Sequence, residues 1–149
     1  KKIIFLLLSR NFLYMYSHEI KLRVRYAETD KMGYVYYGNY AIYFEVARVE
    51  ALRALGMDYK SMEDDGIMLP VHSFDIKYLK PAYYDQELTI VCNILQMPTT
   101  RLVFEYKTYN AEGILLNTAN TTLVFVNAHS GRPTPPPEFL VKQLKVFFN

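Results

Sequence analysis

The chain has 149 residues, a formal net charge of +2, and 51% hydrophobic residues that include 14 Tyr and 9 Phe. This length and composition fit one globular domain and exclude an intrinsically disordered chain. The small net charge argues against a nucleic-acid-binding protein, which usually needs a strongly basic face. The only cysteine, Cys92, excludes an intrachain disulfide and favours a reducing compartment, so we expect a cytoplasmic protein. The histidines have no metal-ligand spacing, so the sequence predicts no metal site.

Residues 1–14 begin with Lys-Lys and a short apolar run, like the start of a signal peptide. The run is broken at Ser9-Arg10-Asn11, and it lacks the small-residue cleavage site of a secretory leader. It is also far shorter than the about 20 residues of a membrane span. We therefore expect residues 1–14 to be an appendage upstream of the natural start, with one domain over residues 15–149 and no membrane span.

The first strand pattern begins after Glu19 and alternates apolar with charged residues, with the apolar positions at Ile20, Leu22, Val24 and Tyr26. A loop is predicted over residues 27–38. Residues 39–55 follow a helical pattern, with an apolar stripe through Ile42, Val46, Val49 and Leu52. We expect Asn39 to be the N-cap of this helix and Gly56 to be its C′ residue.

Four more strand patterns follow, at residues 73–78, 88–95, 101–107 and 114–126. Residues 110–113 (Asn-Ala-Glu-Gly) predict a hairpin turn, and residues 135–137 (three prolines) lead into a short amphipathic tail helix. The order is β-α-β-β-β-β. One long helix wrapped by an antiparallel sheet, an α+β architecture, is the economical packing for that order.

Asp30 stands just before a glycine-bearing loop that leads into the long helix. An acid beside the amino end of a helix is a candidate site for hydrolysing an activated carbonyl, because the helix terminus offers unpaired N–H groups to an oxyanion. Taken alone, the Thr-Asp pair is more typical of a turn or cap. The sequence has no Gly-x-Ser-x-Gly elbow, phosphate loop or dinucleotide fingerprint, which argues against those enzyme classes.

Several segments together resemble the hotdog-fold acyl-CoA thioesterases, within the 4-hydroxybenzoyl-CoA thioesterase-like group that includes the YbgC type. They are residues 26–30, 33–40, 44–48, 52–56, 78–82, 85–88 and 126–133. The resemblance covers about residues 18 to 144. It implies a five-stranded antiparallel sheet around one central helix and hydrolysis of acyl-CoA thioesters without metal or organic cofactor. It also implies a homodimer or dimer of dimers, with each site at the subunit interface.

By this resemblance Asp30 is the catalytic aspartate, acting as general base or nucleophile, and the main-chain N–H of Tyr37 faces the thioester oxygen. Many YbgC-type members have histidine where Tyr37 stands, so a mechanism that needs imidazole is in doubt, but the main-chain donor is kept. The residues expected to bind the substrate are Gly33, Val35, Tyr36, His72, Lys77 and Lys80.

Several alternatives stay open. Glu45 is the runner-up acid, although an ion pair with Arg48 is the preferred interpretation. His72 is either a pocket residue or a hydrogen-bonded structural histidine, whereas Cys92 is expected in the core. Lys77, Lys80, Arg101 and Arg132 are candidates for the CoA phosphates, against solvated charges.

The rival functions are a non-catalytic acyl-CoA-binding module and, less favoured, a hotdog enoyl hydratase or dehydratase, which usually needs an acid and a histidine together. The sequence does not decide which acyl group the substrate carries. It also does not decide whether the carrier of that group is CoA or acyl carrier protein.

Overall fold

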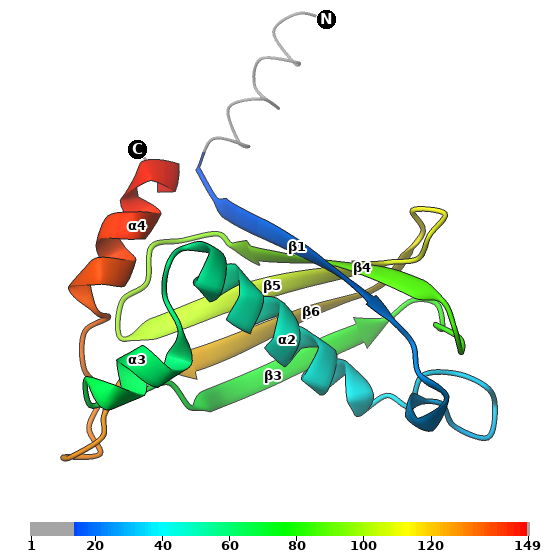
Figure 1. Cartoon of the computed structure of the whole chain (residues 1–149), viewed down its shortest axis with the longest axis horizontal. Coiled ribbons are helices and arrows are strands. Elements are labelled where there is room, and N and C mark those ends of the chain that lie inside the picture. The colour runs from blue at the N-terminus through cyan, green and yellow to red at the C-terminus, as the bar shows by residue number, and fades with distance from the viewer. Residues whose placement is uncertain (1–13, 149) are drawn as a thin grey trace, which may run out of the picture.

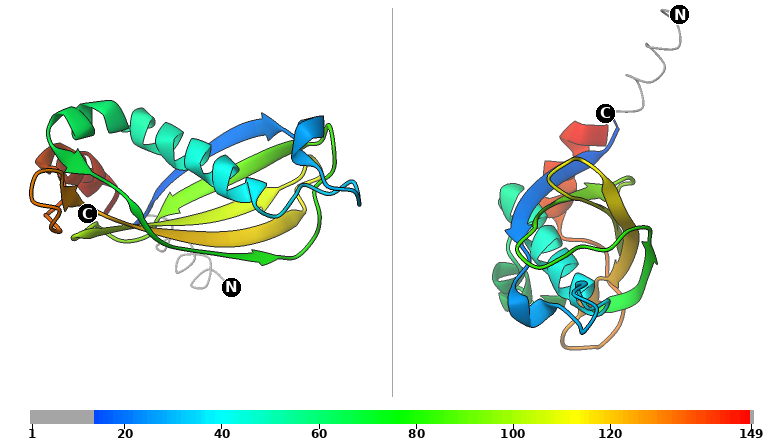
Figure 2. Two further views of the ribbon diagram at one scale, coloured as in Figure 1. Left: turned by 90° about the horizontal axis from the view of Figure 1, so that it is seen from below. Right: turned by 90° about the vertical axis from the view of Figure 1, so that its right-hand side faces the viewer.

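The computed structural model describes residues 14–148, so the appendage expected at residues 1–14 lies almost wholly outside the described residues. Five antiparallel strands form one curved sheet, and the long helix α2 (Asn39–Ala54) lies across its concave face (Figures 1 and 2). The predicted α+β architecture, one long helix wrapped by an antiparallel sheet, is confirmed.

The sheet has the order β1-β4-β5-β6-β3, which places β1 and β3 at its two edges. Its strands are β1 (Tyr16–Arg23), β3 (Val71–Tyr78), β4 (Glu87–Ile94), β5 (Arg101–Tyr109) and β6 (Leu115–Val124). Since side chains alternate between the two faces of a strand, every second residue of β4 and β5 is buried beneath α2. The predicted hairpin turn joins β5 to β6, where the Gly113 N–H donates to the Asn110 carbonyl at 3.0 Å.

The first strand begins and ends earlier than predicted, running from Tyr16 to Arg23. β1 ends at Arg23, and Tyr26 starts the short 3-10 helix η1 (Tyr26–Glu28), where 78% of its surface is exposed. The extension of the strand to Tyr26 is therefore wrong. The reason is local: the main-chain N–H of Arg25 donates to the Glu28 carboxylate at 2.8 Å, which turns the chain out of the sheet.

The sequence patterns missed two small features. Helix α3 (Tyr59–Asp64) begins where the Asp58 carboxylate accepts the Ser61 N–H at 2.8 Å. A two-stranded sheet pairs β2 (Ile67–Met68) with β7 (Val126–Asn127). The predicted tail helix is present as α4 (Glu138–Phe148). No helix in residues 14–148 is long and apolar enough to cross a membrane.

Helix α2 buries only part of the predicted stripe: Leu52 is buried, but Ile42 and Val46 are not. Ile42 and Val46 are 55% and 46% exposed, whereas the buried residues of the helix are Tyr40, Tyr43, Phe44, Ala47, Ala51 and Leu52. The Phe44 ring stacks on Tyr106 of β5 at 4.5 Å between centroids. Small alanines let the helix approach the sheet closely, and aromatic rings fill the space beside them, so side-chain hydrophobicity alone misplaces the buried stripe.

The two ends of α2 also differ in how they match the predictions. Gly56 follows the last turn at φ +82°, a left-handed conformation that favours glycine, so the predicted C′ residue is confirmed. Asn39 is not the N-cap. Gly38 holds that position, and Asn39 is the first helical residue, whose amide donates to the Glu28 carbonyl at 2.8 Å.

Candidate active site

Asp30 lies in the loop between η1 and α2, with its carboxylate held by the loop itself. Its Oδ1 accepts the main-chain N–H groups of Met32 at 2.8 Å and Tyr34 at 3.2 Å. The Asp30 N–H in turn donates to the Tyr34 carbonyl at 2.7 Å, and Gly33 closes the turn at φ +81°. Within the described residues Oδ2 has no hydrogen-bond partner, so one oxygen is fixed and the other is available to a ligand.

The Asp30 carboxylate lines a pocket of about 310 Å³ between the start of α2 and the end of β3. Most of the wall is aromatic or aliphatic, formed by Met32, Tyr34, Val35, Tyr37, Tyr40, Tyr78, Leu79 and Pro81, with Lys80 as its only cation. The Tyr40 and Tyr78 rings pack against each other in this wall, with their centroids 5.7 Å apart. An apolar pocket with a few convergent polar groups is typical of a small-molecule site.

Tyr37 lies at the amino end of α2, one residue before the N-cap Gly38. Its carbonyl accepts the Tyr78 hydroxyl at 3.1 Å, whereas its N–H has no acceptor in the described part of the chain. A free main-chain N–H at the amino end of a helix, in a residue that lines a pocket, is a suitable donor to an oxyanion.

The structure brings together some of the predicted substrate-binding residues and separates others. Val35 and Lys80 line the pocket with Asp30 and Tyr37, and Gly33 forms the adjoining turn. Tyr36 lies outside the lining, with its ring 4.7 Å from that of Tyr37.

Neither predicted residue on the body of β3 reaches this pocket within one chain. Lys77 pairs with Thr118 of β6, and it faces away from its neighbour Tyr78 because side chains alternate along a strand. His72 is exposed near the other end of β3, and its imidazole makes no hydrogen bond to any described residue. The structural hydrogen bond considered for His72 is therefore absent.

The residues that sequence reasoning missed are the aromatic walls, Tyr34, Tyr40 and Tyr78, and the buried Glu28. Tyr40 and Tyr78 both belong to the segments that carry the family resemblance, so a signal was present in the sequence. Their meeting depends on the pairing of β3 with β6, which no local pattern encodes.

The runner-up acid lies elsewhere. Glu45 lines a separate depression between α2 and α3, together with Arg48 and Tyr59. The expected Glu45–Arg48 ion pair is wrong, because the Arg48 Nε donates to the Tyr59 hydroxyl at 3.3 Å instead. Cys92 is buried in β4 as predicted, and burial raises the pKa of its thiol.

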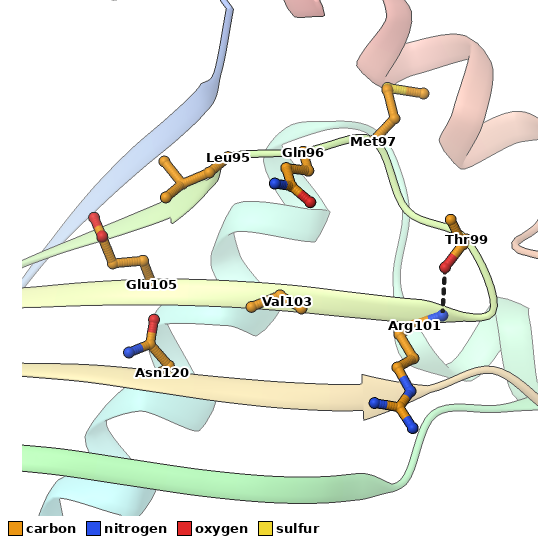
Figure 3. Close-up of a pocket in the computed structure, with 8 residues that line it drawn as sticks. All are labelled: Leu95, Gln96, Met97, Thr99, Arg101, Val103, Glu105 and Asn120. Atoms are coloured by element: carbon orange, nitrogen blue, oxygen red, sulfur yellow. Dashed lines mark hydrogen bonds between the residues drawn. The ribbon is translucent and has the colours of Figure 1, made fainter.

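A second pocket, of about 370 Å³, lies on the convex face of the sheet (Figure 3). It is lined by Leu95, Gln96, Met97, Thr99, Arg101, Val103, Glu105 and Asn120. Because Val103 alternates with the buried Leu102 and Phe104, this pocket opens away from α2. Arg101 therefore lies across the sheet from Asp30. Among the described residues no group of three or more His, Cys, Asp or Glu side chains is placed to hold a metal ion.

A family model described as the thioesterase-like superfamily matches residues 24–144. The acyl-CoA thioester hydrolase YbgC of Escherichia coli O157:H7 is 33% identical over 124 residues, which cover 83% of this chain and 92% of that protein.

Solved structures are similar over most of the chain. A DHNA-CoA thioesterase from Staphylococcus aureus has a TM-score of 0.76 and 34% identity, covering 80% of each chain. A 4-hydroxybenzoyl CoA thioesterase mutant complexed with 4-hydroxybenzoyl CoA has a TM-score of 0.78 and 20% identity. It covers 87% of this chain and 99% of that one, and this likeness concerns the fold alone.

Proposed function

Because this chain belongs to the thioesterase-like superfamily and is an enzyme that hydrolyses acyl-CoA thioesters, we propose that Asp30 and the Tyr37 main-chain N–H are its catalytic groups. The observation that carries this proposal is the placement of Asp30, a half-buried carboxylate in an aromatic pocket at the amino end of α2. The family membership confirms the predicted hotdog fold and enzyme class.

The proposed reaction uses the free Oδ2 of Asp30. Acting as a general base, Oδ2 takes a proton from water as the water oxygen bonds to the thioester carbon. Acting as a nucleophile, Oδ2 bonds to that carbon itself and forms an anhydride, which water then hydrolyses. In both routes the carbon–sulfur bond breaks, the CoA thiolate leaves, and water supplies the atoms that complete the free acid and the thiol. As proposed, no metal or organic cofactor takes part.

The Tyr37 N–H is proposed to stabilise the oxyanion that forms on the thioester oxygen. A preorganised donor of this kind is commonly worth about 10²–10³ in rate. Since the donor is main chain, the reaction does not depend on the side chain at this position. The tyrosine ring instead adds apolar surface to the pocket.

The pocket suits an apolar acyl group, and Lys80 at its wall is proposed to attract the phosphates of CoA or of a carrier-protein prosthetic arm. We further propose that the enzyme works in the cytoplasm, since a chain with Cys92 as its only cysteine suits a reducing compartment.

We also propose a homodimer built along β3. This edge strand is exposed on both faces, and Val71, Phe74 and Tyr78 are 50%, 39% and 46% exposed. An exposed edge strand with apolar side chains is a template for pairing with a second chain. Such pairing would place the partner beside Tyr78 and so beside the pocket. The exposed Ile42 and Val46 on α2 offer a further apolar surface for a dimer of dimers.

The test is thioester hydrolysis by the Asp30→Asn variant, with thiol release followed on a panel of short aliphatic, long aliphatic and benzoyl-type acyl-CoAs. We expect a loss of at least about 10³-fold in kcat on the best substrate, with the thermal midpoint kept, because the amide neither accepts a proton nor attacks carbon. The matched control is Asp64→Asn at the exposed end of α3, which should keep full activity. Near-normal turnover by Asp30→Asn would refute the assignment.

A further inference from the structure

Glu28 is a buried acid close to the pocket that the proposed reaction does not use. It is 8% exposed and does not line the pocket. Its Oε1 accepts the Nε and Nη2 groups of Arg25 at 2.8 and 2.6 Å. Its Oε2 accepts the Arg25 main-chain N–H at 2.8 Å and the Tyr43 hydroxyl at 2.6 Å. A buried carboxylate is costly unless it is paired and hydrogen-bonded, and here both oxygens are occupied.

The main chain of Glu28 is held as firmly as its side chain. Its carbonyl accepts the Tyr36 N–H at 2.9 Å and the Asn39 amide at 2.8 Å. Asn39 and Tyr43 are four residues apart on α2 and therefore lie on the same face of the helix. One helical face thus donates to both ends of Glu28, to its carbonyl and to its carboxylate.

These contacts reach both proposed catalytic groups. Asp30 follows Glu28, the last residue of η1, by two residues along the chain. The Tyr36 carbonyl and the Tyr37 N–H belong to one planar peptide. The neighbouring Tyr36 N–H donates to the main-chain carbonyl of Glu28, and the Tyr36 carbonyl accepts the Asn39 N–H at 2.9 Å. The direction of the Tyr37 N–H is therefore set by the same contacts that anchor the Asp30 loop.

We propose that Glu28 is a positioning residue that fixes the Asp30 carboxylate relative to the Tyr37 N–H. This inference rests on the function proposed above. Glu28 is not itself the reacting acid, because both of its carboxylate oxygens are occupied and it does not line the pocket. Catalytic groups must be held within about 0.5 Å of their productive geometry, and buried hydrogen bonds behind the site are the usual means of doing so.

The first test is Glu28→Gln, which keeps the size of the side chain but replaces one acceptor oxygen with an N–H₂ donor that faces Arg25 or Tyr43. We expect kcat to fall about 10- to 100-fold with KM within twofold, since a misplacement of about 1 Å can cost 10² in rate. The matched control is Glu63→Gln on the exposed surface of α3. All rates are measured well below the thermal midpoint of each variant.

Tyr43→Phe removes one donor to the carboxylate and serves if Glu28→Gln does not fold. It should lower kcat in the same direction but by less. In a double variant the two losses should not multiply, because both substitutions disturb the same contact. A purely structural role predicts a lower thermal midpoint with kcat unchanged for the folded enzyme, and that result would overturn the proposal.

A third comparison separates this inference from the proposed function. In an Asp30→Asn background, measured in single turnover with enzyme in excess, Glu28→Gln should cost less than a third of its loss in the wild type. A full repeat of that loss would show that Glu28 acts independently of Asp30. An active Asp30→Asn variant refutes the catalytic assignment, whereas an inactive Asp30→Asn with a fully active Glu28→Gln refutes the positioning role alone.

Discussion

The hydroxyl of Tyr78, at the end of edge strand β3, donates a 3.1 Å hydrogen bond to the main-chain carbonyl of Tyr37, 41 residues earlier in the chain. This bond joins the sheet to the amino end of α2 at the wall of the pocket. Residue 78 also belongs to the strand through which we propose that two subunits pair. The oxyanion donor and the proposed dimer interface are thus connected through one side chain.

Replacing Tyr78 with Phe removes this bond and keeps the ring. We expect kcat to fall about 3- to 10-fold, because a hydrogen bond that is partly exposed contributes on the order of 1 kcal/mol. KM should change little, since the ring still lines the pocket. Steady-state kinetics against Tyr109→Phe, a tyrosine of β5 outside the pocket, checks the result. An unchanged kcat would show that the bond to the Tyr37 carbonyl does not help to orient the Tyr37 N–H.

Local patterns predicted the elements of this fold well. Strand alternation and helix ends, such as the one at Gly56, depend on residues that are neighbours in the sequence. The same patterns misplaced what depends on distant contacts. The buried face of α2 is chosen by the fit of Phe44 against Tyr106, and not by the apolar Ile42 and Val46.

The residues of the candidate site likewise fall into two groups, those predicted from local sequence and those that depend on distant contacts. Asp30 and Tyr37 are predicted from one continuous segment, and the family resemblance supplies their roles. The pocket wall at Tyr78 and the anchor at Glu28 are tertiary relationships. Glu28 in particular looks like a surface acid in the sequence, and only the hydrogen bond from Tyr43 shows why it is buried.

The stability of the protein at acid pH should depend on the protonation of the Glu28 carboxyl. Burial alone would raise the pKa of its carboxyl, but the hydrogen bonds from Tyr43 and Arg25 outweigh burial and hold that pKa below its usual value. A carboxyl whose pKa is lowered in the folded state stabilises the protein above its unfolded pKa, about 4.3 for Glu. This stability is lost as the pH falls through the folded pKa.

We therefore expect the wild type to exceed Glu28→Gln in free energy of unfolding near pH 7, with the difference shrinking below about pH 4.3. Urea unfolding at a series of pH values measures it, with Glu63→Gln as the exposed control. A difference that stays constant down to pH 3 would contradict the lowered pKa of Glu28.

Replacing Thr108 on β5 would measure the cost of an unpaired polar group buried beneath α2. Thr108 is fully buried, and its hydroxyl has no hydrogen-bond partner among the described residues. An unpaired buried hydroxyl costs about 1–3 kcal/mol, so Thr108→Val, which keeps the shape, should stabilise the protein by about 1 kcal/mol. Thr122→Val, on the outward face of β6, should change the stability little. A loss of stability in Thr108→Val would indicate that the hydroxyl binds an ordered water molecule.

The proposed dimer makes a prediction that links assembly to activity. Val71 on β3 is 50% exposed, and a lysine there would place a charge in the apolar edge where the second chain is expected to pair. We expect Val71→Lys to shift the protein towards the monomer in sedimentation experiments and to lower kcat, because the proposed pairing places the partner subunit beside Tyr78 and the pocket. Val146→Lys on α4, a position that is 73% exposed, is the matched control and should keep the assembly. A Val71→Lys monomer with full activity would show that one chain holds a complete site.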